Sequence, residues 1–292
     1  PIFGSLAFEI GCYQREADIF ALFSEHDDLA VPEMYGFEAG DDPRSVVIVL
    51  EEITDARTAS PTEGCSVEES AEVIRNIARI HSRFWNDPRI PTIENVAKAA
   101  EGWDQNMKLG WEALAERHGD RAGDDLALFE WVKDNMLGLI EHRTSSPQTL
   151  SHGDFHPENV LFTPYPRNNS VLIDWQFAIA GPGIHDVSMF IISSLSVEER
   201  RQHEDSLLRT YHDVLTTDAN FHYSYDEMYF DYRAAATFAM FKALLKASLI
   251  GTPNVRPDII EIADAVFERA LAAVQDLNPV GALKEALVKI RS

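Results

Sequence analysis

Apolar residues recur at helical spacing close to the start of the chain. In READIFALF, residues 15–23, the side chains of Ile19, Phe20 and Phe23 follow Glu16 at intervals of three, four and seven and therefore share one face. This spacing predicts an amphipathic helix. Glu16 is the unusual member, because a carboxylate on an apolar face needs a partner or a route to water. It would equally complement the helix dipole from the first turn, and the pattern leaves both interpretations open.

Two strand-forming segments follow this helix. In residues 31–38, VPEMYGFE, a strand is expected after the proline, and residues 45–53, SVVIVLEEI, form a β-branched run with two acids near its end. Turn-forming residues 40–45 separate the two segments, so a pair of short strands is expected. The polar segment 54–64 predicts a loop and a domain boundary after residue 53.

Most of the remaining chain has a helical pattern. Ser66 and Glu69 form a capping-box pattern before one long helix, and Ser196 and Glu199 form a second. Residues 95–143 are expected to be mainly helical. The apolar segment 234–251 contains Lys242 and Lys246, which favours a core helix over a membrane span. The predicted fold class is α+β, with a small part at residues 1–53 and a large, mainly helical part at residues 54–292.

One strand-turn-strand pattern interrupts the helices. The apolar residues 160–162 and 171–174 flank a turn rich in proline and asparagine, which predicts a hairpin. A polar segment, HGDFHPEN, leads into the first strand, and Asp174 ends the second. Because the two strands fold back on each other, Asn159 and Asp174 are expected to lie close together, with Asp154 nearby.

The spacing in this polar segment allows two kinds of chemistry. His152, Asp154 and Asn159 stand at the offsets of a kinase catalytic loop, with Gly153 in place of arginine, and Asn159 and Asp174 carry the oxygen ligands that suit Mg²⁺. Alternatively, His152, Asp154 and His156 have the spacing of transition-metal ligands in a metal-dependent hydrolase. The hydrolase hypothesis leaves Asn159 and Asp174 unexplained.

Composition narrows the class of protein. The 292 residues carry a formal charge of −23, and no basic stripe is present, so nucleic acid is not an expected partner. The two cysteines show neither metal-ligand nor disulfide spacing, which favours a cytoplasmic location. The acidic charge indicates either a solvated surface or the attraction of a cationic substrate. Nothing in the composition indicates the oligomeric state.

The motifs together resemble a known superfamily. HGDFHPENVLF at 152–162, VLIDWQ at 171–176 and GIHDVSMF at 183–190, with READIF, VLEEI and ARIHSRFW before them, resemble the aminoglycoside phosphotransferase and choline kinase group. Within that group the similarity is greatest to the ecdysteroid-kinase-like branch and its bacterial relatives. The resemblance covers essentially the whole chain. It implies a protein-kinase-like two-lobe fold, with a truncated N-lobe at residues 1–53 and a large helical C-lobe.

The resemblance also implies an activity and a catalytic centre. The activity is transfer of the γ-phosphoryl group of ATP, with Mg²⁺, to the hydroxyl group of a small-molecule alcohol. Asp154 would be the catalytic base or would orient that hydroxyl, and His156 would contact the transferred phosphate. Asn159 and Asp174 would bind Mg²⁺.

Further roles follow from the same resemblance. His152 and Asp186 would support the catalytic loop. Glu16 would pair with a phosphate-binding lysine, which would explain its place on an apolar face. The remaining nucleotide contacts would come from the hinge, at Glu51 and Ile53, and from an apolar floor under adenine, at Leu161 and Ile173.

The sequence departs from the family at its start. No glycine-rich hairpin or phosphate-binding lysine precedes Glu16, and the first residue is Pro1 rather than methionine. We therefore expect either a piece of a longer kinase or a catalytically silent, nucleotide-binding pseudokinase. The acceptor stays open among steroid-like alcohols, amino alcohols, aminoglycosides and sugars.

Overall fold

The N-terminal part of the chain consists of one helix and a two-stranded sheet. The computed structural model describes residues 12–40, 46–93, 96–164, 169–217, 220–253 and 255–292. Helix α2 (Cys12–Phe23) is followed by the antiparallel strands β1 (Met34–Ala39) and β2 (Val46–Leu50). The predicted helix and both strands are thus confirmed, although β2 ends before Glu51. The expected lack of a glycine-rich hairpin applies to the segment before α2. Residues 1–11 of that segment lie outside the described ranges.

Helix α2 joins this part to the rest of the molecule through its apolar face. Ile19, Phe20 and Phe23 are almost completely buried. The ring of Phe23 meets Trp175 at 4.7 Å and Phe84 at 5.9 Å between centroids, both edge to face. Because aromatic pairs of this geometry add to the apolar burial, α2 is held against the turn that carries Trp175.

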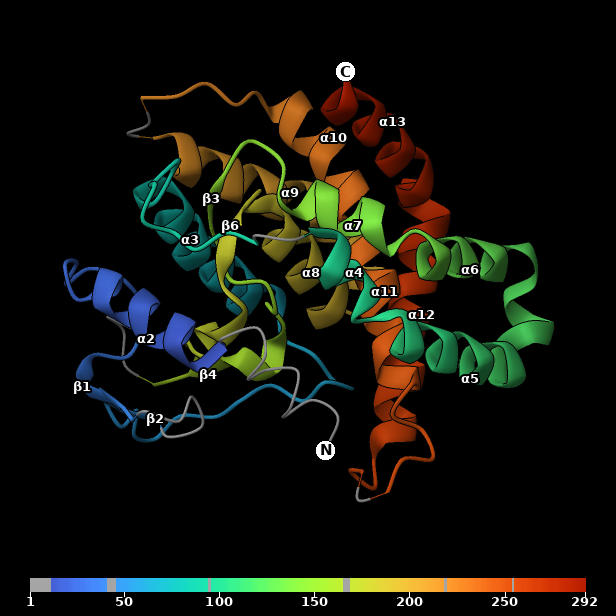
Figure 1. Cartoon of the computed structure of the whole chain (residues 1–292), viewed down its shortest axis with the longest axis horizontal. Helices are drawn as coiled ribbons and strands as arrows, with labels where there is room; N and C mark the ends of the chain where they lie inside the picture. The colour runs from blue at the N-terminus through green and yellow to red at the C-terminus, as the bar shows by residue number, and fades with distance from the viewer. Residues whose placement is uncertain (1–11, 41–45, 94–95, 165–168, 218–219, 254) are drawn as a thin grey trace.

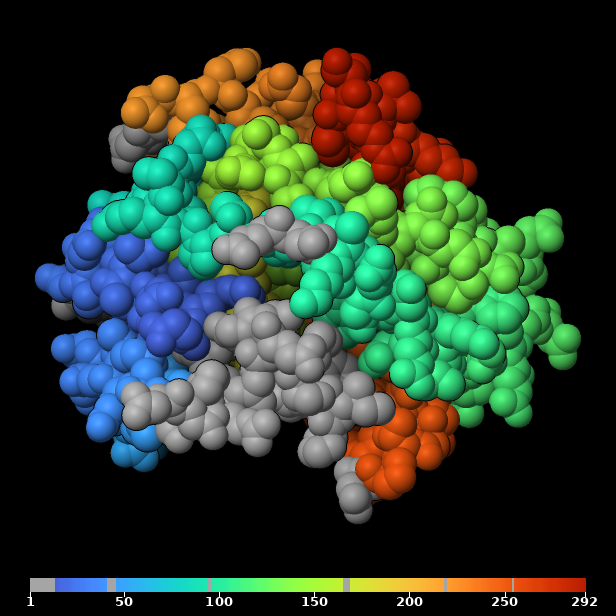
Figure 2. Space-filling model, in the orientation of Figure 1, coloured from blue at the N-terminus to red at the C-terminus, as the bar shows by residue number. Residues whose placement is uncertain are grey.

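The remaining chain is mainly helical (Figure 1). Its helices are α3 (Val67–Arg83), α4 (Val96–Glu101), α5 (Asp104–Ala122), α6 (Leu126–Asp134), α7 (Met136–Arg143), α8 (Ile184–Ser194), α9 (Val197–Thr216), α10 (Tyr225–Ala235), α11 (Thr237–Ala247), α12 (Ile259–Leu277) and α13 (Pro279–Arg291). Short 3-10 turns lie at Gly123–Asp125, Pro157–Asn159 and Trp175–Phe177. Figure 2 shows α2, β1 and β2 gathered on one side of the molecule and the helices of residues 96–143 on the other.

Capping boxes start three of these helices. Both predicted boxes are present, at Ser66 before α3 and at Ser196 before α9. A third, with Ser224 and Glu227, starts α10. It has the same Ser-x-x-Glu spacing, although it was not among the predicted helix starts. In each box the serine hydroxyl accepts a backbone N–H that the helix leaves unpaired.

Two further pairs of short strands lie among the helices. Strand β3 (Thr149–Ser151) pairs with β6 (Ile179–Gly181), and β4 (Val160–Phe162) pairs with β5 (Ser170–Leu172), both antiparallel. The β4–β5 pair confirms the predicted hairpin. Its second strand is shorter than expected, because Asp174 adopts a left-handed conformation with φ of 66°, which cannot continue a strand.

Helix α11 lies in the middle of the helical part. It packs against α5, α8 and α12 and buries most of its residues, as expected for a core helix. Its two lysines, Lys242 and Lys246, are only partly exposed. Within the described ranges, no helix is both long and apolar enough to cross a membrane.

Candidate active site

The loop that follows β3 is anchored by hydrogen bonds to one buried carboxylate. Asp186, in the first turn of α8, accepts hydrogen bonds from the backbone N–H groups of His152 at 2.7 Å and Gly153 at 3.0 Å. The hydroxyl of Ser151 and the ring of His81 complete its contacts, at 3.2 Å each. Burial alone would raise the pKa of Asp186, but these contacts hold it below its ordinary value. A buried carboxylate with four partners fixes the loop firmly.

The side chain of His152 is completely buried inside the protein. Its ring contacts Trp175 and Phe155, and its Nε2 lies 2.9 Å from the carbonyl oxygen of Ile173. Its Nδ1 faces the backbone N–H of Asp154. Both ring nitrogens are therefore engaged by backbone, which removes His152 from the ligand set that a metal-dependent hydrolase would need.

Gly153 is required by its surroundings. It adopts φ of 81°, and a side chain at this position would collide with the Arg143 guanidinium and the carbonyl oxygen of Phe177. Arg143, from the end of α7, donates to that same carbonyl at 3.1 Å. Gly153, which replaces the arginine of the kinase loop, thus leaves space for the side chain of Arg143 from helix α7.

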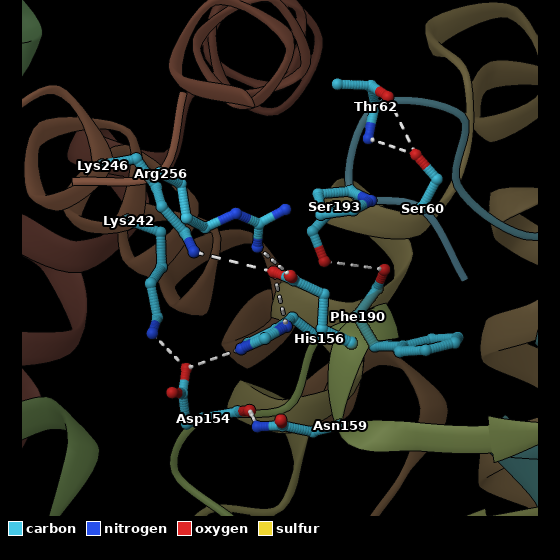
Figure 3. A network of polar contacts seen from close by, with 12 residues as sticks. Ser60, Thr62, Asp154, His156, Asn159, Phe190, Ser193, Lys242, Lys246 and Arg256 are labelled. Atoms are coloured by element: carbon cyan, nitrogen blue, oxygen red, sulfur yellow. Dashed lines mark hydrogen bonds and ion pairs between the residues drawn. The ribbon is translucent and has the colours of Figure 1, made fainter. Parts of the chain in front are cut away.

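Asp154 faces a cation that the sequence pattern did not reveal. Its Oδ1 forms an ion pair with Lys242 Nζ and lies 3.6 Å from Nε2 of His156 (Figure 3). Burial by itself would raise the pKa of Asp154, but Lys242 and His156 together hold it well below the ordinary value. Asp154 is therefore ionised throughout the neutral pH range.

Asn159 and Asp174 lie beside this loop, at the two ends of the hairpin. Asn159 Nδ2 donates to the carbonyl oxygen of Asp154 at 2.9 Å, and the Ile173 N–H donates to the carbonyl oxygen of Asn159 at 3.1 Å. Burial and the nearby Asp154 carboxylate raise the pKa of Asp174, although His152 and Gln176 oppose the increase. The folding of the hairpin brings the two ends together as predicted.

Glu16 adds a second carboxylate next to Asp174. Its Oε1 accepts the Trp175 backbone N–H at 3.1 Å. Burial and the Asp174 charge raise the pKa of Glu16 to about 7. The Asp174 charge thus disfavours the ionised form of Glu16, and a divalent cation bound between them would remove part of this cost.

These groups form an incomplete set of ligands for a metal ion. Among the described residues, no three His, Cys, Asp or Glu side chains lie together as a metal-binding group. Mg²⁺ normally takes one or two protein oxygens and completes its shell with phosphates and water, so one carboxylate and one amide oxygen fit it. The donor set at Asn159 and Asp174 therefore suits Mg²⁺ carried by a nucleotide better than a permanent metal.

The expected adenine contacts lie in two other segments. Glu51 directly follows β2, where its backbone N–H donates to the carbonyl oxygen of Glu33 at 2.8 Å, and Ile53 lies two residues further on. Leu161 is in β4, and Ile173 follows β5. Both apolar side chains are half-buried, which leaves part of each accessible to a ligand.

A cavity of about 190 Å³ opens next to Asp154. Its walls contain residues for which the sequence pattern predicted no functional role, among them Trp103, Arg143, Phe238, Lys242 and Lys246. Trp103 is only partly buried. The sequence signal for the two lysines was their spacing of four residues, which places them on one face of an apolar helix but does not identify what they contact.

This arrangement defines a class of protein. The loop that carries Asp154 is anchored by Asp186 and is followed by a hairpin with Asn159 and Asp174 at its ends. A small part with the helix that carries Glu16 lies beside them. These features are those of the protein-kinase-like fold. The sequence matches the model of the phosphotransferase enzyme family, APH, over residues 12–237. The chain belongs to this family.

Solved structures support the same fold. A choline/ethanolamine kinase family protein from Mesorhizobium loti has 14% identity and a TM-score of 0.55, over 95% of this chain and 83% of that one. A putative aminoglycoside phosphotransferase from Ralstonia eutropha has 15% identity and a TM-score of 0.56, over 94% and 84%. The amicoumacin kinase in complex with AMP-PNP, Ca²⁺ and Ami has 13% identity and a TM-score of 0.54, over 89% and 77%. No curated protein matches the sequence significantly. The narrower resemblance to the ecdysteroid-kinase-like branch stays a prediction.

Proposed function

We propose that this protein transfers the γ-phosphoryl group of ATP to a hydroxyl group of a small molecule. The observation that carries the proposal is the position of Asp154. Its carboxylate lines the cavity of about 190 Å³, while Asn159, which does not line that cavity, is bonded to its backbone. The ionised carboxylate of Asp154 would thus lie between an acceptor in the cavity and a nucleotide bound at the hairpin.

The residues divide the work of positioning between them. Asp154 orients the acceptor hydroxyl and accepts its proton late in the transfer. Asn159 and Asp174 hold Mg²⁺, which when bound would neutralise charge on the nucleotide phosphates. His156, within reach of Asp154, contacts the transferred phosphoryl group. His152 and Asp186 keep the loop in place through the contacts described above.

The remaining residues of the proposed site contact the nucleotide. Leu161 and Ile173 form the floor under adenine, and the backbone of Glu51 and Ile53 meets its edge. Glu16 lies beside Asp174, where it supports the phosphate side of the site. The amicoumacin kinase, whose fold is similar, binds AMP-PNP together with Ca²⁺, which supports a site of this kind here. The division into lobes at residues 1–53 and 54–292 belongs to the same proposal.

Two substitutions test the function. Asp154→Asn keeps the shape of the side chain but removes its charge, so it should lower turnover by about a hundredfold or more and spare nucleotide binding. Asp174→Ala should weaken binding of the Mg²⁺ complex of a non-hydrolysable ATP analogue, measured by calorimetry. Asp205→Asn, on the exposed face of α9, is the control.

The outcome also separates an enzyme from a silent relative. An Asp154→Asn protein with unchanged turnover would remove Asp154 from its role. Tight nucleotide binding without transfer to any alcohol of a broad library would favour the pseudokinase instead.

A further inference from the structure

The cavity beside Asp154 has mainly apolar walls. Aromatic rings line much of it: Trp103 meets Phe241 edge to face at 5.3 Å between centroids, and Phe241 lies 5.9 Å from Phe238. Phe177 adds a fourth ring. A cavity of about 150 Å³ is sufficient for benzene, so the 190 Å³ here suits a body of one substituted ring. It is small for an aminoglycoside of several sugar rings.

The charges on the walls are mostly positive. Arg143, Lys242 and Lys246 line the cavity, whereas Asp154 is its one acidic lining residue among the described residues. Asp154 is already paired with Lys242, and the Arg143 guanidinium lies over the ring of Phe238 at 5.8 Å. The local field therefore opposes the overall negative charge of the protein and favours an anion.

Of the two lysines that line the cavity, Lys246 has the more distant carboxylate partner. Its Nζ lies 3.7 Å from the Glu158 carboxylate, while Arg256 donates to the same carboxylate at 2.7 Å (Figure 3). The side chain of Lys246 is only 25% exposed. Burial and the neighbouring Lys242 lower its pKa, so an anionic partner would relieve a real electrostatic cost.

We propose that the acceptor of this enzyme is a ring-containing alcohol that carries an anionic group, such as a carboxylate, and that Lys246 binds this group. The inference rests on the proposed function, because the same cavity presents the hydroxyl to Asp154. The rings surround the body of the acceptor, and Lys246 sets the distance between its anion and its reacting hydroxyl. Lys246 is thus a specificity-determining residue.

A cationic acceptor is the main competitor. Aromatic rings attract quaternary ammonium groups, and four rings line this cavity. However, Arg143 already covers a face of Phe238, and a cationic ligand would meet three positive side chains with one neutralised carboxylate. Like charges that share one partly buried cavity repel each other strongly.

Three matched alcohols test the inference directly. They are 4-(hydroxymethyl)benzoate, 1,4-benzenedimethanol and 4-(hydroxymethyl)benzyltrimethylammonium, which share a ring and a reacting hydroxyl but are anionic, neutral and cationic. Their binding to the protein with Mg²⁺ and a non-hydrolysable ATP analogue is measured by calorimetry. We expect the benzoate to bind about tenfold more tightly than the neutral diol, the factor that about 1.4 kcal/mol corresponds to. The ammonium compound should bind most weakly.

A substitution series assigns the effect to one side chain. Lys246→Gln should remove the preference for the benzoate over the neutral diol, and Lys246→Arg should restore that preference. Lys289→Gln, an exposed residue of α13 whose side chain is 60% exposed, is the control. Equal binding of all three alcohols, or tightest binding of the ammonium compound, by the unsubstituted protein would overturn the inference without any variant.

The two proposals fail in different ways. Charge-selective binding that persists while no alcohol is phosphorylated would refute the proposed kinase function. Phosphorylation of alcohols without a preference for the anionic one would refute only the acceptor class. Loss of the preference in Lys246→Gln, in a protein that still phosphorylates the neutral diol, would support both.

Discussion

Lys242, on helix α11, forms an ion pair with Oδ1 of Asp154, a residue that lies 88 positions earlier in the chain. The two side chains are both largely buried, with exposed fractions of 16% and 18%. The pair ties the loop after β3 to the core of the helical part and keeps the carboxylate ionised. An aspartate with so low a pKa is a weak general base, so in the proposed mechanism its main contribution would be to orient the acceptor hydroxyl.

Substitution of Lys242 tests this relationship. Lys242→Met removes the cation that lowers the pKa of Asp154, so that pKa should rise. Because the proposed mechanism requires the ionised form of Asp154, turnover should fall on the acidic side at a higher pH than in the unsubstituted protein. The pH profile of kcat measures the shift, with Lys289→Met as the control. An unchanged acidic side of the profile would contradict the assigned coupling.

Glu16 should make the stability of the protein depend on pH. Its pKa is raised from 4.5 to about 7 in the folded protein. The folded state then holds more protons than the unfolded state between these values, so the free energy of unfolding should fall as pH rises from about 4.5 to 7 and level off above. Glu16→Gln should reduce this dependence and be the more stable protein above pH 7, as urea unfolding in Mg²⁺-free buffer would measure. Parallel pH profiles for both proteins would contradict the prediction.

Gly153 and Gly119 provide a matched pair of substitutions. Gly153→Ala should destabilise the protein by at least about 1–3 kcal/mol and lower turnover, because the backbone is left-handed there and the new methyl group meets Arg143. Gly119→Ala, in α5, meets no neighbouring atom and should be neutral or stabilising by up to about 1 kcal/mol. Thermal unfolding and initial rates compare the two. Equal stability of both variants would show that the loop tolerates a side chain at residue 153.

On the acidic side of the pH range, binding of the Mg²⁺–nucleotide complex should release protons. Asp174 must be ionised to bind a cation, and its pKa is raised by burial and by Asp154. Affinity should therefore begin to weaken at a higher pH than for an ordinary aspartate as the solution is acidified. Calorimetry in two buffers of different ionisation enthalpy measures the released protons. The Asp174→Asn variant should bind the Mg²⁺–nucleotide complex more weakly and release fewer protons. Equal proton release by both proteins would show that another group titrates.

The local features of this protein follow from the order of its residues. The helix at 15–23, the hairpin that joins Asn159 to Asp174 and the capping boxes at Ser66 and Ser196 all appear where their patterns predict them. Each depends on hydrogen bonds or apolar contacts between residues a few positions apart, and such interactions leave a periodic trace in the sequence. The offsets within 152–159 have the same local origin.

The charge on the walls of the cavity beside Asp154 depends on contacts between distant segments. Only the packing of α11 and α7 against the loop brings Lys242, Lys246 and Arg143 to Asp154, since no spacing in the sequence relates these residues. The overall charge of −23 suggested a cationic substrate as one alternative, yet the cavity walls are positive. Electrostatic interactions act over ångströms in space, so the field at a site is set by the few charges that folding places there and not by the sum over the chain.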